Sequence, residues 1–193
     1  MNKNIAPILA LAAIVVIGGG ALMASRANST KSQSAMTTMS PSPTAAAALD
    51  EKQFIEQMIS HHADAIGMAQ LAPDKAKTTE VKVLAANIAS AQQKEIDEMK
   101  GWYKSWYGKD VPEMTDMSGM SESSGKMMND LRSSSNFDLA FVTQMIPHHE
   151  SAIKMAKAVL PTANHQEIKD LANSIISSQT AEIEQMKMLK QTL

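Results

Sequence analysis

The stretch that decides the fold is FIEQMISHHADAIGMAQ, residues 54–70, which the chain repeats as FVTQMIPHHESAIKMAK, residues 141–157. At the same offset of 87 residues, EVKVLAANIASAQQKEIDEMK (80–100) aligns with EIKDLANSIISSQTAEIEQMK (167–187). Neither alignment needs a gap. Self-similarity at one fixed offset predicts two copies of one structural unit.

Apolar residues recur at three- and four-residue steps through the repeat, which is typical of helices. The sequence predicts four long helices over about 50–71, 78–107, 136–160 and 164–193, with a connector at 108–135. Two helical hairpins with short internal turns most simply form an all-α, up-down-up-down four-helix bundle. We expect residues 50–193 to form this one domain.

The repeated histidines flank the predicted buried stripe. At about 100° per residue, Met58, His61 and Met68 share one quadrant of their helix with Phe54, while His62 lies at a different angle. Adjacent residues on a helix point in different directions, so His61 and His62 cannot easily bind one ion together. Met58 can chelate an ion with His61, three residues later, or with His62, four residues later. The second copy places four residues in the same relation: Met145, His148, His149 and Met155.

The second copy has Pro147 where the first has Ser60. A proline inside a helix removes one backbone amide and displaces the carbonyl four residues earlier. We therefore expect a kink just before His148.

Composition restricts the chemistry available. The 193 residues carry a formal charge of −2 without a long run of either sign, so nothing indicates nucleic-acid binding. The absence of cysteine excludes disulfides, thiolate chemistry and zinc fingers. The 16 methionines leave thioether as the soft ligand.

Methionines also occur where no apolar core is expected. The connector contains MTDMSGM, which has Met114, Met117 and Met120 at three-residue spacing. In an up-down bundle Met99 and Met186 come to the end that the connector leaves, so we expect metal to enter there. Neutral thioethers suit copper(I) and silver(I) better than zinc, calcium or magnesium.

Three other interpretations remain for the methionines. Met68 and Met155 fit ordinary core packing, since methionine fills irregular gaps in a helical core. The connector methionines also fit a hydrophobic partner-binding surface on a helical interaction module, or a sink for oxidants.

Catalytic motifs are missing from the sequence. No Glu-x-x-His pairing for a di-metal site, no HExxH and no Gly-rich phosphate loop occurs. Glu95 and Glu182 occupy matching positions, and we expect them to hydrogen-bond the histidines. The pattern predicts a binding protein and no enzyme.

The N-terminal region indicates export. Lys3 precedes an apolar run, and small residues precede a cleavage position after Ala27, so 1–27 is predicted to be a signal peptide or else an uncleaved anchor. Residues 28–49, rich in Ser, Thr, Ala and Pro, are expected to be a flexible tether. We expect a periplasmic or extracellular protein without stable membrane contact after cleavage.

The motif FVTQMIPHHESAIKMA resembles the signature of the CopM-like family, the domain of unknown function 305, and the resemblance covers about 50–193. It implies an exported, ferritin-like helical protein that binds copper(I) and silver(I) and supports copper resistance. We also expect another copper-handling protein as a partner. On matching positions it implies these ligands: Met58, His61, His62, Met68, Met99, Met145, His148, His149, Met155 and Met186. Ser60 departs from the usual proline, so the two sites differ in this respect.

Overall fold

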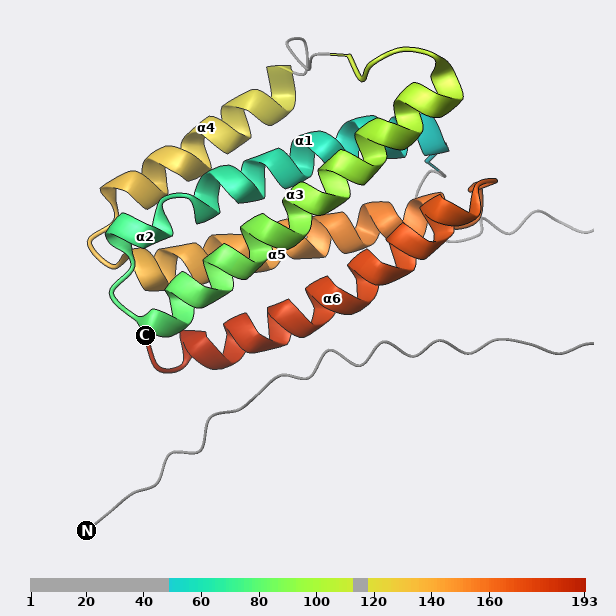
Figure 1. Ribbon diagram of the computed structural model, residues 1–193. Coiled ribbons are helices and arrows are strands. Elements are labelled where there is room, and N and C mark those ends of the chain that lie inside the picture. Colours follow the sequence, from blue (N-terminus) through green and yellow to red (C-terminus); the bar gives the residue numbers. More distant parts are fainter. Residues whose placement is uncertain (1–48, 113–117) are drawn as a thin grey trace, which may run out of the picture. The chain divides into compact units, whose positions relative to one another are not determined.

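A computed structural model describes residues 49–112 and 118–193, and nearly all of the predicted signal peptide and tether, with Met114 and Met117, lies outside them. The described part is helical, as predicted (Figure 1). Its helices are α1 (Glu51–Ala69), α2 (Ala72–Lys75), α3 (Thr79–Tyr107), α4 (Ser118–Ser133), α5 (Phe137–Val159) and α6 (Gln166–Lys190). None of these helices combines the length and apolarity that a membrane span requires.

Short polar side chains begin three of the long helices. Each accepts a hydrogen bond from a backbone N–H in the first turn, which satisfies a donor that lacks a helical partner; these caps are Asp50, Thr78 and Asn136. α6 has no such side-chain cap, and the two residues just before it are held across the fold instead, because the Glu51 carboxylate accepts the backbone N–H of Asn164 at 2.6 Å and of His165 at 2.7 Å. This contact ties the first hairpin to the second.

One glycine within α3 and one directly after it give a matched stability test. Gly108 ends the helix with φ of 68°, a left-handed conformation that costs an L-residue roughly 1–2 kcal/mol. Gly101 lies exposed within the helix, and a Cβ there meets nothing within 4 Å. We expect Gly108→Ala to lower and Gly101→Ala to raise the melting temperature of the metal-free protein, measured by circular dichroism. Shifts of the same sign would contradict these assignments.

The buried apolar side chains form two clusters. Core I includes Phe54, Met58, Met99, Tyr103, Val159 and Ile168. Core II includes Met68, Val81, Phe137, Phe141, Met145 and Met186.

The order of residues in the two cores gives the direction of each helix. α1 and α6 run from core I to core II, whereas α3 and α5 run from core II to core I. The predicted up-down-up-down order is therefore wrong, because α3 and α5 share one direction and the two hairpins are inverted relative to each other. Met99 and Met186 consequently lie in different cores, and the predicted convergence of both at one end is also wrong.

The connector explains the inversion. The sequence predicted a break in helical structure over 108–135, but residues 118–133 form α4. Sixteen helical residues span about 24 Å, enough to return the chain along the bundle before α5 begins. Leu131 of α4 is buried in core II, and Ser124 donates a hydrogen bond to Asp64 of α1 at 2.6 Å.

The packing of the long helices leaves one side open. α1 packs against α3 and α5, α5 packs against α6, and α4 covers α1 and α5. No comparable packing joins α3 to α6. α5 continues without interruption through Pro147, and a bend at this proline stays a prediction.

Candidate metal-binding site

His61 and His148 meet in the middle of the bundle. Their ring centroids lie 3.7 Å apart with an interplanar angle of 38°. The two residues are 6% and 7% exposed. They are equivalent positions of the repeat, and the inversion of the hairpins brings α1 and α5 together at this point.

The other two histidines bind carboxylates on the neighbouring helices. His62 Nε2 lies 2.6 Å from Glu95 Oε2, and His149 Nε2 lies 2.7 Å from Glu182 Oε2. The structure thus confirms the expected pairing of these glutamates with histidines. When such a ring donates from Nε2 to the carboxylate, the tautomer with its lone pair on Nδ1 is the one that can ligate a metal. Neither Nδ1 has a hydrogen-bond partner among the described residues.

The central pair is held in the neutral form. Burial, and secondly repulsion from the other histidines, lowers the pKa of His61 to about 3 and that of His148 to about 2. His61 Nδ1 and both ring nitrogens of His148 have no partner in the part of the chain described. Neutral imidazoles with unused lone pairs are ready to ligate a metal.

The histidine–glutamate pairs also fix which methionines face each other. Met58 lies four residues before His62, and Met99 four residues after Glu95, so these residues are opposed in the antiparallel pair α1 and α3. The same relation opposes Met145 and Met186 in α5 and α6. All four are fully buried.

One further methionine joins each pair from the opposite hairpin. Methionine group I, in core I, contains Met58, Met99 and the partly buried Met155. Methionine group II, in core II, contains Met145, Met186 and Met68. The 87-residue offset relates the groups member by member, so the interior has two equivalent sets of thioethers on either side of the histidines.

Two connector methionines whose side chains are described lie against core II. Met127 and Met128 of α4 pack against core II. Met128 lies close to Gly67 of α1, where its sulfur is 3.9 Å from the position that a Cβ would take. Of the predicted connector ligands, Met120 belongs to α4 and Met114 and Met117 lie outside the described residues.

Two buried glutamines, one in α3 and one in α6, were missed by sequence reasoning. Gln92 and Gln179 are 3% and 2% exposed, and the Oε1 atom of each has no partner in the described structure. Their signal in the sequence is the occurrence of the same polar residue in both copies, 87 positions apart, on the buried side of α3 and α6.

The donor set fits a soft monovalent cation. Neutral thioethers and imidazoles suit copper(I) and silver(I), which accept sulfur and nitrogen ligands. Among the described residues, no three His, Asp or Glu side chains converge on one point as a cage for a harder ion requires. The interior is thus rich in soft, uncharged donors.

Solved structures of one relative, CopM, resemble this fold. CopM in its Cu(II)-bound form is 41% identical, with a TM-score of 0.68 over 75% of this chain and 98% of CopM. CopM structures in the Cu(I)-bound and Ag-bound forms each give a TM-score of 0.66 at 40% and 41% identity, covering 75% of this chain and 97% of CopM.

Two other relatives match smaller parts of this chain. A DUF305 protein from Streptomyces coelicolor, described as a candidate secreted protein, is 26% identical with a TM-score of 0.63 over 70% of this chain and 87% of its own. Uncharacterized protein L153 of Acanthamoeba polyphaga mimivirus is 41% identical over 51 residues, 26% of this chain. That match spans only 34% of the viral protein.

The family described as Domain of unknown function (DUF305) matches residues 51–190, which include α1 through α6. The match contains both copies of the repeat and both methionine groups. This chain belongs to the DUF305 family.

Proposed function

We propose that this protein is an exported copper(I)- and silver(I)-binding protein that sequesters metal or passes it on in copper homeostasis and resistance. The observation that carries the proposal is the pair of equivalent methionine groups on either side of buried, neutral histidines. The proposed interior ligands are Met58, His61, His62, Met68, Met99, Met145, His148, His149, Met155 and Met186. Met114, Met117 and Met120 are proposed as connector ligands.

The relatives support this assignment. CopM has been solved with Cu(I), Cu(II) and silver, and it matches this chain over both hairpins. Binding of Cu(I) and silver by CopM agrees with the soft, neutral donors of the methionine groups in this chain. Binding rather than catalysis is the role that we assign to the site.

We further propose that residues 1–27 direct export and that 28–49 tether the bundle domain. A periplasmic or extracellular location agrees with the description of the Streptomyces relative as a candidate secreted protein. In an oxidising compartment, thioether ligands cannot be lost to disulfide formation. A second copper-handling protein is the natural recipient of the metal.

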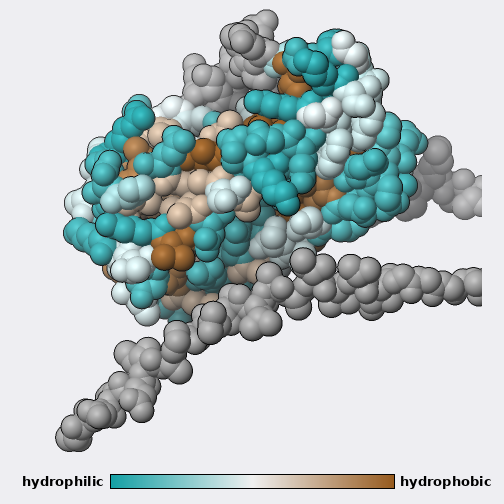
Figure 2. Space-filling view, viewed as in Figure 1, coloured by the Kyte–Doolittle hydropathy of each residue, from teal (hydrophilic) through white to brown (hydrophobic). Residues whose placement is uncertain are grey.

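The main alternative is a helical module with a methionine-rich docking surface. Figure 2 shows one face of the domain, on which hydrophilic colour prevails and hydrophobic colour gathers mainly in the left half of the view. The exposed large apolar side chains of the described residues are Val83 and Met188. Met127 and Met128 pack inward against core II, which favours metal binding over docking.

Competition between metals tests the proposed function. We expect silver(I) to bind the reduced, metal-free protein much more tightly than zinc(II), because the interior donors are mostly neutral thioethers. The protein is loaded with silver, dialysed against excess zinc at neutral pH, and analysed for both metals. Replacement of silver by zinc would contradict the proposal.

A further inference from the structure

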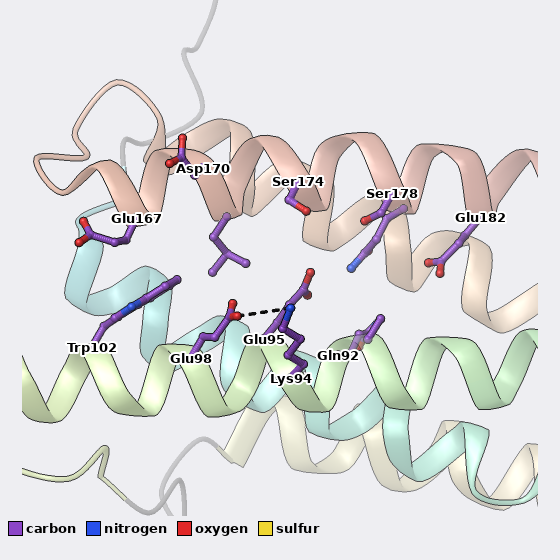
Figure 3. Close-up of a pocket in the computed structure, with 13 residues that line it drawn as sticks. Gln92, Lys94, Glu95, Glu98, Trp102, Glu167, Asp170, Ser174, Ser178 and Glu182 are labelled. Atoms are coloured by element: carbon purple, nitrogen blue, oxygen red, sulfur yellow. Dashed lines mark ion pairs between the residues drawn. The ribbon is translucent and has the colours of Figure 1, made fainter. Parts of the chain in front are cut away.

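An open groove of about 530 Å³ separates α3 from α6. Figure 3 shows Glu98 and Trp102 of α3 pointing toward α6 and Glu182 of α6 pointing toward α3, and Glu167 and Asp170 also line the groove. This is the side on which the long helices do not pack together, and α4 covers other helices.

The groove is strongly acidic. Five carboxylates line it against a single ammonium, that of Lys94; they belong to Glu95, Glu98, Glu167, Asp170 and Glu182. Lys94 Nζ lies 3.8 Å from Glu98 Oε1, and because both side chains are exposed this ion pair is weak. The whole chain has a formal charge of only −2, so negative charge is concentrated here.

Gln92 and Gln179 also line the groove, and both are more than nine-tenths buried. Each has an Oε1 acceptor without a hydrogen-bond partner in the described structure. A buried acceptor without a donor is costly. Two of them, at equivalent positions of the repeat and in the lining of an acidic groove, are acceptors that a cationic ligand would satisfy.

The groove leads to the buried histidines. Glu95 and Glu182 line it with side chains 17% and 22% exposed, and they also contact fully buried His62 and His149. One layer of side chains thus separates the groove from the imidazoles. The carboxylates are spread along the groove, and none of the described carboxylates and histidines form a three-ligand cage. This arrangement therefore suits transient binding of a cation better than permanent coordination.

We propose that the groove between α3 and α6 captures monovalent soft cations and is their route to the buried histidines and methionine groups. This inference rests on the proposed function and places metal uptake at the side of the bundle instead of at the connector end. The carboxylates attract the cation over a distance, and the unpaired carbonyl oxygens of Gln92 and Gln179 become its acceptors as it moves inward. An acidic groove of this kind raises the association rate without adding affinity at the final site.

The test compares rates of silver uptake by the full-length, metal-free protein. Silver nitrate is mixed by stopped flow, and quenching of tryptophan fluorescence is followed at several ionic strengths. The groove variant is Glu98→Gln, Glu167→Gln, Asp170→Asn, which changes three exposed side chains. The control variant, Asp74→Asn, Asp130→Asn, Glu150→Gln, removes the same charge from exposed positions outside the groove lining.

We expect the groove variant to take up silver about tenfold more slowly at low ionic strength, with a flatter salt dependence, because steering raises on-rates by 10-fold or more. The number of silver ions bound at equilibrium should not change. The control should keep the rate and salt dependence of the parent. A second variant, Gln92→Leu with Gln179→Leu, should be slowed at high ionic strength as well, because it removes the two amide acceptors and leaves the charge unchanged.

Two results would overturn the inference in distinguishable ways. If the parent binds silver but the groove variant matches the control in rate and salt dependence, the route is wrong and the proposed function stands. If the parent binds no silver at any ionic strength, the proposed function fails and the route fails with it.

Discussion

Replacing all six buried or partly buried methionines of the two groups by leucine removes tight silver(I) and copper(I) binding in the interior while the bundle stays folded. Leucine is apolar and of similar volume, and such exchanges in a core usually cost less than about 1.5 kcal/mol each. Leucine has no sulfur, so each group loses its donors for a soft cation. The variant carries these changes at Met58, Met68, Met99, Met145, Met155 and Met186.

Equilibrium dialysis with elemental analysis measures the bound metal, and circular dichroism measures helicity. Met188→Leu is the matched control, because Met188 is 64% exposed and belongs to neither methionine group. We expect this control to bind as the parent does. A folded six-leucine variant with the silver stoichiometry and affinity of the parent would show that the core methionines are only packing residues.

Acidification should destabilise the metal-free protein through His61 and His148. Both pKa values are lowered in the folded state, to about 3 and about 2, whereas an unfolded histidine has a pKa near 6.5. Between these values the unfolded state binds more protons, so stability is full above about pH 6.5 and falls as pH decreases through this window. At pH 4.5 the loss amounts to about 2–3 kcal/mol per histidine.

Urea unfolding at pH 7.0 and pH 4.5 measures this effect. His61→Leu with His148→Leu should flatten the pH dependence, and it should also stabilise the metal-free protein at pH 7, because it removes buried ring nitrogens that lack partners. His61→Leu alone and His148→Leu alone should each remove part of the pH dependence of stability. If the double variant lost as much stability as the parent on acidification, other groups would be responsible.

The helices could be predicted from the sequence because their signals are local. Apolar spacing and polar caps such as Asp50 and Thr78 depend on neighbouring residues only. The relative direction of the hairpins depends on α4, whose stretch is rich in Ser and Gly. Only a short apolar stripe around Met127, Met128 and Leu131 indicates that it packs on the bundle. The sequence prediction treated the connector as non-helical, so it could not give the correct relative direction of the two hairpins.

The candidate site was predicted in its residue types and only partly in its arrangement. The repeat identified the histidines, and matching helical positions predicted their contacts with Glu95 and Glu182. The distribution of methionines into two groups could not be predicted without the direction of α5 and α6. Gln92 and Gln179 were missed because a glutamine on a helix usually faces solvent, and only the tertiary packing shows them to be buried.

Copper K-edge X-ray absorption on the copper(I)-loaded protein tests the central claim most directly, because it identifies the atoms bound to the metal. Our account predicts a copper(I) edge and a first shell containing sulfur together with imidazole nitrogen, with the sulfur contribution lost in the six-leucine variant. A first shell of oxygen and nitrogen alone in the parent protein would contradict the claim that the methionine groups hold the metal.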